Sequence, residues 1–169
     1  SEFAPYNSFY AAGRRLEISR IDVKSVEPET WRLCPNCNYA ALDSSLHNVS
    51  TCPRCGSPAW ADTDQKCTMI RPKTVYSDMK YEAARSGDES DDRTSRFYTR
   101  QLLVDVDEDN DVLYGYRTTG GDLPFGYDFV KKATMREINF GESDMMGKAF
   151  PVAGITQPRK GFTVCHYCG

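Results

Sequence analysis

Histidine and long apolar runs are what this sequence has least of. Its two histidines are His47 and His166, so a histidine-based catalytic triad or a histidine-rich catalytic metal site is poorly supplied. No apolar run approaches the ~18 residues that a transmembrane helix needs, and the first residues lack the basic and apolar regions of a signal peptide. These absences predict a cytoplasmic protein with no membrane partner.

A functional phosphate-binding loop is also missing. Gly141 to Lys148 has five residues between its glycines where a phosphate loop has four, and Ala149 replaces the Ser or Thr that would hold Mg²⁺. The alternating acids at 105–111 do not match the spacing of an EF-hand calcium loop either. We therefore expect no ATP hydrolysis by this chain alone, and a solvated acidic turn at 107–111.

Cysteine, by contrast, is abundant, with seven among 169 residues and six of the seven in C-x-x-C pairs. Such pairs predict metal binding in a reducing compartment rather than disulfides. The first two pairs are separated by fourteen residues and supply four thiolates, the tetrahedral donor set that Zn²⁺ prefers. Four sulfur ligands leave no position for water, so the zinc is structural. The predicted ligands are Cys34, Cys37, Cys52 and Cys55.

The third pair, Cys165 and Cys168, cannot fill a tetrahedral site alone. We favour ligands beyond Gly169 as its other half, so that residues 165–169 begin a second zinc knuckle. A thioredoxin-like redox role is not expected, because the chain shows no βαβ unit around the pair. The alternatives left open are a disulfide, a free dithiol, or a site completed within the chain by Cys67, His47 or His166.

The charge balance limits contact with nucleic acid to a local patch. The chain has 21 Lys and Arg against 24 Asp and Glu, a net charge of −3, whereas residues 131–160 carry a net charge of +3. Basic side chains beside an aromatic suit phosphate contact and base stacking, although an ordinary solvated surface is the competing interpretation. Arg54, inside the second cysteine pair, is a further candidate phosphate contact. The residues predicted to bind DNA are Lys131, Lys132, Arg136, Arg159, Lys160 and Phe162.

Strand-like alternation dominates the first half of the chain. Residues 14–26 alternate between apolar and polar side chains with one slip after Ser19, which predicts a strand with a bulge. Residues 67–75 predict a second strand, with Pro72 at an edge position. The polar, acid-rich residues 82–96 predict a surface loop.

The second half also favours strands. Residues 101–106 and 112–117 predict a hairpin with the acidic turn at its tip. Residues 129–140 fit both a helix and a strand, and their β-branched and aromatic content favours a strand over the second half.

These patterns together predict an α+β, β-rich fold, made mainly of antiparallel sheet with an inserted four-cysteine zinc ribbon. Residues 4–30 and 61–164 form a β-rich domain in this interpretation. Residues 31–60 form the ribbon insertion, which Trp60 closes, and residues 165–169 start the candidate second knuckle.

Most of the chain resembles a known family. Leu123–Phe129 (LPFGYDF), followed by Thr134–Gly141 (TMREINFG), resembles the C-terminal accessory region of MrfA-like superfamily-two DEAD/DEAH-type bacterial DNA helicases. Phe9-Tyr10, the stretch Gly13–Ile18 and the cysteine pairs also fit. In that family the region carries cysteine-bound zinc and follows two motor domains. The resemblance implies a part of an ATP-binding, DNA-dependent motor in DNA repair or defence, although the motor's own motifs are missing here.

Two functions therefore compete. The first is a non-catalytic zinc-binding accessory domain of an ATP-dependent DNA helicase, which supports DNA engagement or docking on the motor domains of the same parent polypeptide. The second is a zinc-ribbon protein–protein interaction module with no nucleic-acid role, which docks through Trp60 and nearby aromatics. A small zinc-dependent enzyme is disfavoured, because a site closed by four cysteines has no open position. Salt-sensitive DNA binding would favour the first function.

Overall fold

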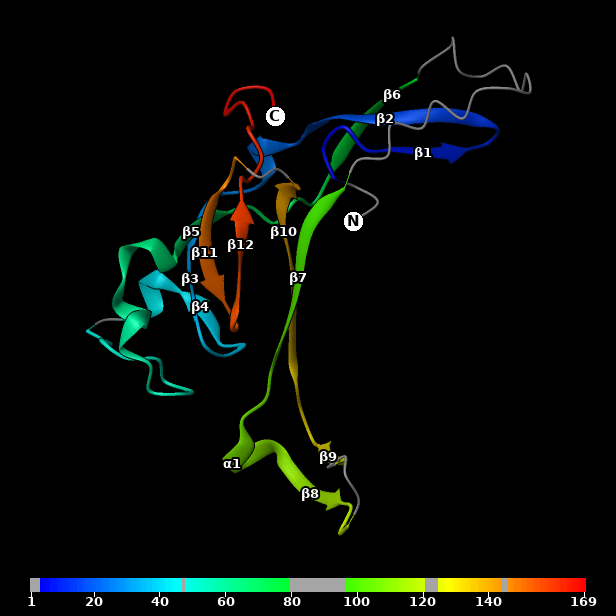
Figure 1. Cartoon of the computed structure of the whole chain (residues 1–169). Coiled ribbons are helices and arrows are strands. Elements are labelled where there is room, and N and C mark those ends of the chain that lie inside the picture. The colour runs from blue at the N-terminus through cyan, green and yellow to red at the C-terminus, as the bar shows by residue number, and fades with distance from the viewer. Residues whose placement is uncertain (1–3, 47, 80–96, 121–124, 144–145) are drawn as a thin grey trace.

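The structure is a computed structural model that describes residues 4–46, 48–79, 97–120, 125–143 and 146–169. Within these ranges every paired strand is antiparallel, and the one α-helix is a single turn. The sheets follow one another along an elongated molecule, and a two-stranded arm, formed by residues 98–117 and 126–142, projects from one end of it (Figure 1). The predicted β-rich, mainly antiparallel fold class is confirmed.

The N-terminal sheet contains the bulge that the sequence predicted. The register of its central strand slips between Ile18 and Arg20, at Ser19, where the alternation of the sequence also slips. The slip lets both Ile18 and Ile21 face the interior, where both are buried. A 3-10 turn, η1 (Val23–Ser25), follows this strand. In order across the sheet, the strands are β1 (Ser8–Ala11), β2 (Arg14–Ile21) and β6 (Val75–Met79).

The second sheet has the order β4 (Ala40–Leu42), β3 (Glu29–Leu33) and β5 (Lys66–Met69). The predicted single strand at 67–75 was wrong in extent, because β5 ends at Met69 and β6 begins at Val75 in the other sheet. Pro72 lies in the connection between them, where its missing N–H and fixed φ interrupt the ladder. Three 3-10 turns flank this sheet: η2 (Asp43–Ser45), η3 (Pro58–Ala61) and η4 (Thr63–Gln65).

The predicted hairpin of residues 101–106 with residues 112–117 was wrong. These two segments do not pair: β7 (Tyr98–Asp105) pairs with β10 (Thr134–Glu142), and β8 (Val112–Arg117) pairs with β9 (Gly126–Val130).

The physical reason lies at the acidic turn. Residues Glu108–Asp111 form the single helical turn α1, which the Asp107 side chain caps by accepting a hydrogen bond from the Asn110 amide. This turn directs β8 away from β7, so β8 does not run back beside it. Cross-strand pairs of aromatics then join β8 to β9. The predicted strand over the second half of 129–140 is confirmed as β10, and the predicted loop at 82–96 lies outside the described residues.

The main core joins the second sheet, the arm and a final hairpin, β11 (Lys148–Val152) with β12 (Ile155–Arg159). Backbone bonds fix the turn of this hairpin against the first cysteine pair, because Ala153 N donates to Cys34 O at 2.9 Å and Gly154 N donates to Pro35 O at 2.6 Å. The first cysteine pair is therefore held by the folded core. The buried members of the core are Leu33, Ala40, Leu103, Phe140 and Val152.

Candidate metal centre

The structure brings together the four cysteines that the sequence predicted as metal ligands. All four sulfur atoms lie within 4.8 Å of one another. Cys34 Sγ is 3.6 Å from Cys55 Sγ, and Cys37 Sγ is 3.6 Å from Cys52 Sγ. A tetrahedral ion with metal–sulfur bonds of ~2.3 Å has sulfur–sulfur edges of about 3.8 Å. The cluster therefore has the size and the donor set of a four-thiolate metal site.

Backbone hydrogen bonds shape both cysteine turns. In the first, the Asn36 amide donates to Cys34 Sγ at 3.4 Å. In the second, Cys52 N donates to Ser57 O at 2.9 Å, and Gly56 N donates to Cys52 O at 2.8 Å. Gly56 has a φ of +72°, in the left-handed region that glycine adopts without steric cost. The C-x-x-C-G sequence thus dictates the turn that presents the second pair of thiols.

Burial sets the acidity of these thiols. Burial raises the pKa of Cys34 to about 11, and burial also raises the pKa of Cys37. Burial also pushes the pKa of Cys55 upward, but hydrogen bonds from the Ser57 amide and the neighbouring thiols outweigh it and lower that pKa. Buried thiols ionise when a cation compensates the negative charge. A divalent metal ion supplies that charge, and its binding releases protons.

An aromatic cover closes the cluster on one side. The Trp60 side chain is fully buried, and the Tyr39 ring lies 5.4 Å from it, centroid to centroid. Leu46 and Val49 pack against the same group. Trp60 therefore closes the ribbon, as its sequence position predicted. Its predicted second role, as a docking residue, was wrong, because a buried ring offers no surface to a partner.

Arg54, the candidate phosphate contact between the second pair of cysteines, forms ion pairs with acids of the same chain. Its Nε lies 2.9 Å from Asp105 Oδ1, and its Nη1 lies 3.4 Å from Asp107 Oδ1. These ion pairs tie the second cysteine turn to the end of β7. The metal cluster is thus connected to the arm through Arg54.

The residues predicted to bind DNA do not form one surface. Lys131 and Lys132 are exposed in the turn between β9 and β10, at the base of the β8–β9 pair, whereas Lys160 follows β12 toward the C-terminus (Figure 1). Arg159 is 5% exposed and belongs to the core, so its place does not suit a phosphate contact. Phe162 is half-buried, and its ring packs against the ring of a β7 tyrosine at 6.0 Å.

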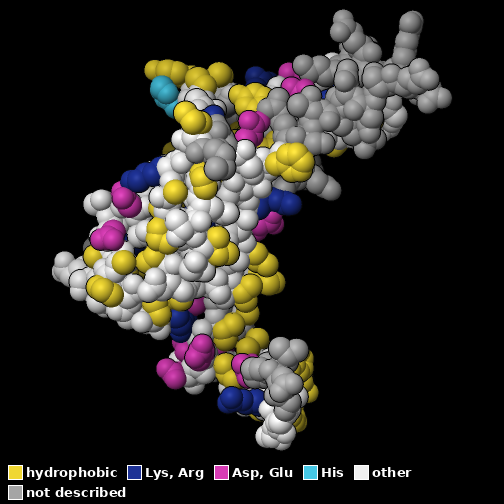
Figure 2. All heavy atoms as spheres, in the orientation of Figure 1, with side chains coloured by type: hydrophobic (Ala, Val, Ile, Leu, Met, Phe, Trp, Pro, Cys, Tyr) yellow, Lys and Arg dark blue, Asp and Glu magenta, His cyan; other side chains and the backbone are white. Residues whose placement is uncertain are grey.

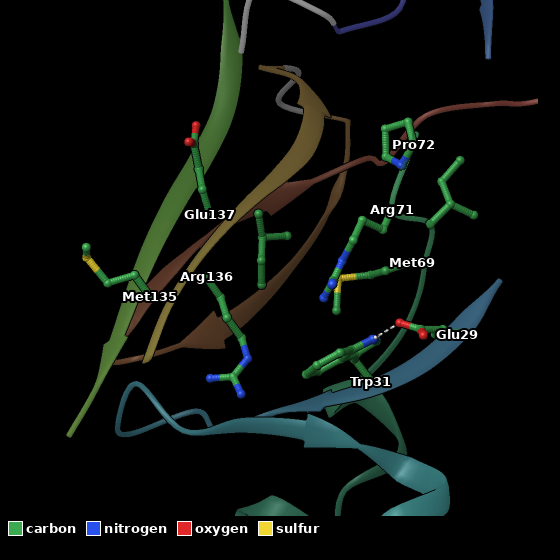
Figure 3. A pocket seen from close by; sticks show the side chains of 10 residues that line it. Glu29, Trp31, Met69, Arg71, Pro72, Met135, Arg136 and Glu137 are labelled. Atoms are coloured by element: carbon green, nitrogen blue, oxygen red, sulfur yellow. Dashed lines mark hydrogen bonds between the residues drawn. The ribbon is translucent and has the colours of Figure 1, made fainter. Parts of the chain in front are cut away.

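Arg136 lines a hollow of about 420 Å³ between β3 and β10 (Figure 3). Its guanidinium lies 5.5 Å from the centroid of the Trp31 ring, whose Nε1 donates to Glu29 Oε2 at 2.9 Å. Arg71 and Glu137 complete the charged lining. Two arginines and two glutamates leave the hollow without net charge, which does not favour a phosphate ligand.

The sequence interpretation missed an exposed set of aromatics on the arm, here called the aromatic face. In the β8–β9 register Tyr114 pairs with Phe129 and Tyr116 with Tyr127, so alternation places all four on one side. The signal was present in the alternating Tyr-Gly-Tyr and Phe-Gly-Tyr-Asp-Phe runs. Hydrophobic side chains gather at this end of the molecule (Figure 2). The aromatic face comprises Tyr114, Tyr116, Phe125, Tyr127 and Phe129, which are 52%, 58%, 63%, 49% and 45% exposed.

No family model, curated protein or solved structure matches this chain. Among the described residues, no helix has the length and apolar character needed to cross a membrane. The metal cluster and the aromatic face are therefore the features from which a function can be argued.

Proposed function

We propose that this chain is a non-catalytic, zinc-binding accessory domain of a larger ATP-dependent DNA helicase. The observation that carries the proposal is the closed cluster of four thiols. With four protein sulfurs around it, a bound Zn²⁺ has no open position for water, so it stabilises structure instead of activating a nucleophile. The helicase part of the proposal is supported by the resemblance of residues 123–129 and 134–141 to MrfA-like helicases.

Zinc in this cluster would fix the surroundings of both cysteine turns. The first turn lies under the β11–β12 hairpin, through Cys34 and Pro35, and the second is tied to β7 by Arg54. Structural zinc in small modules contributes about 10–16 kcal/mol of apparent binding free energy. Part of that free energy would hold the base of the arm in place, since the same turns contact both the core and the arm.

The aromatic face is the surface through which we expect the domain to dock. Each of its side chains is nearly half exposed or more, whereas exposed contiguous apolar patches of soluble proteins commonly mark interaction sites. Residues 106–133 carry six acids against three bases. This charge disfavours a polyanion such as DNA and favours a protein partner with a basic surface. Docking on a motor domain of the same parent polypeptide is therefore the better supported role of the arm.

A protein–protein interaction module with no nucleic-acid role is the second candidate. The same aromatic face favours it, because nothing in that face requires a DNA-dependent partner. The two candidates differ in whether the natural polypeptide that contains this chain is a DNA-stimulated ATPase.

The test compares this chain with the full product of its natural gene. We expect the full product to hydrolyse ATP when DNA is added, and this chain to hydrolyse none. In the full product, the double change Tyr116→Ser and Phe129→Ser should lower the DNA-stimulated rate severalfold by weakening docking. Tyr10→Ser, which removes an exposed aromatic from β1, is the matched control and should leave the rate unchanged.

Each possible failure has a distinct meaning. A full product without DNA-stimulated ATP hydrolysis would contradict the helicase proposal and leave the interaction module ahead. DNA-stimulated hydrolysis that the double change does not lower would contradict the docking role of the aromatic face.

A further inference from the structure

The C-terminal cysteine pair is folded like the second turn of the four-cysteine cluster. In the cluster, Gly56 N donates to Cys52 O at 2.8 Å, and at the C-terminus Gly169 N donates to Cys165 O at 2.8 Å. The two glycines have φ values of +72° and +89°, both in the left-handed region. The residues between the cysteines differ, Pro-Arg in one turn and His-Tyr in the other. The backbone geometry is therefore a shared property of the C-x-x-C-G sequence.

We propose that residues 165–169 are the preformed half of a second metal site, which takes Zn²⁺ or another thiophilic divalent cation. A tetrahedral site needs four ligands, and this pair supplies two. Both thiols are exposed, so a second pair of ligands can reach them. The knuckle rests on the end of β2, because a Cβ at Gly169 would lie 1.8 Å from the Ile21 carbonyl oxygen. Figure 1 shows this segment beside β2, away from the turns of the four-cysteine cluster.

The remaining ligands are not found among the residues that the structure describes. There, the four-cysteine cluster is the one group of three or more candidate ligands close enough to share an ion. Cys67 lies in β5 and packs against the main core instead. The His166 ring lies against Tyr167, with 3.9 Å between centroids, and His47 falls outside the described residues.

The site needs two further thiolate or imidazole ligands. Two alternative sources can supply them. One is the same cysteine pair of a second copy, which would join two chains through a shared ion. The other is a further part of the natural polypeptide. Both supply the same coordination chemistry, so the shared site is proposed and the source is decided by experiment.

The experiment loads this chain with Zn²⁺ under reducing conditions and measures zinc by elemental analysis and mass by light scattering. If a second copy completes the site, the parent chain forms a dimer with about 1.5 zinc per chain, one per four-cysteine cluster and one shared. The double change Cys165→Ser and Cys168→Ser should then give a monomer with about one zinc. Cys67→Ser is the control and should retain the dimer and its zinc.

If the natural polypeptide completes the site, this chain remains a monomer, and the full gene product loses about one zinc with the same double change. The proposal is overturned if that change alters neither zinc content nor mass in either protein. Cys37→Ser reports on the four-cysteine cluster separately, since it removes zinc from that cluster alone. The outcome is therefore independent of whether the helicase proposal holds.

Discussion

Arg159 donates a hydrogen bond to Gln101 inside the main core, with 2.7 Å between Nη2 and Oε1. The two residues are 5% and 7% exposed. Gln101 Nε2 in turn donates to Val152 O at 2.8 Å, and the guanidinium lies 4.8 Å and 4.9 Å from the ring centroids of Phe140 and Phe150. This buried pair joins β7 to the hairpin whose turn holds the first cysteine pair.

Arg159→Ala should lower the free energy of unfolding by about 3 kcal/mol. The change leaves the Gln101 oxygen and the Phe150 carbonyl without their donor and opens a cavity between two rings. Urea unfolding of the zinc-loaded protein measures it. The neighbouring change Lys160→Ala, at an exposed position, should stay within about 0.5 kcal/mol of the parent. Equal effects at the two positions would contradict the structural role of Arg159.

Gly141→Ala should cost about 3 kcal/mol of stability. Gly141 has a φ of +93°, and an added Cβ would lie 2.2 Å from the Gly161 carbonyl oxygen. Gly13→Ala is a matched comparison, because Gly13 has a φ of +71° but open space around it. It should cost about 1 kcal/mol, from the backbone conformation alone. Thermal unfolding that ranks the two variants in the opposite order would refute the close approach at Gly141.

The features that the sequence predicted correctly depend on local spacing. The fourteen-residue separation of two C-x-x-C pairs was enough to identify the four ligands that cluster in space. A slip in the alternation at Ser19 was enough to place the bulge of β2. Both signals lie within the segment that they describe.

The features that it missed depend on distant partners. Pairing of β7 with β10 follows from a four-residue helical turn that redirects the chain, and alternation within β7 carries no sign of it. Arg159 lies near an aromatic residue in the sequence. This pattern is the same whether the folded protein places the arginine in the core or on the surface. The aromatic face becomes one surface when β8 lies beside β9, although each run of alternating aromatics was visible alone.

Asp43 should make part of the stability sensitive to acid. Its carboxylate accepts hydrogen bonds from Lys66 at 2.8 Å and from Arg32 at 2.7 Å, and these bonds lower its pKa below 3.8. Because the folded pKa is below the unfolded value, this stabilisation is present above the unfolded pKa and is lost as the pH falls through the folded pKa.

Asp43→Asn should therefore flatten the decline in stability between about pH 5 and pH 3. Urea unfolding at a series of pH values measures the decline. Asp62→Asn changes an exposed acid of the same region and is the control. Its stability should depend on pH in the same way as that of the parent. A profile of Asp43→Asn that coincides with the parent would show that this carboxylate does not contribute.

DNA binding by this chain alone should be weak, with a Kd above about 10 µM at physiological salt. The predicted basic residues are dispersed, Arg159 is buried, and the arm is acidic. Fluorescence anisotropy with a labelled single strand and a labelled duplex measures the affinity. Submicromolar binding that survives physiological salt would contradict the assignment of the arm to a protein partner.

The zinc content of the freshly purified protein tests the central claim most directly. Elemental analysis should find at least about one zinc per chain, and Cys37→Ser should remove the ion held by the four-cysteine cluster and loosen residues 31–60. Cys67→Ser, which leaves that cluster intact, should retain the ion. A freshly purified protein that is folded and contains no zinc would contradict a structural zinc held by Cys34, Cys37, Cys52 and Cys55.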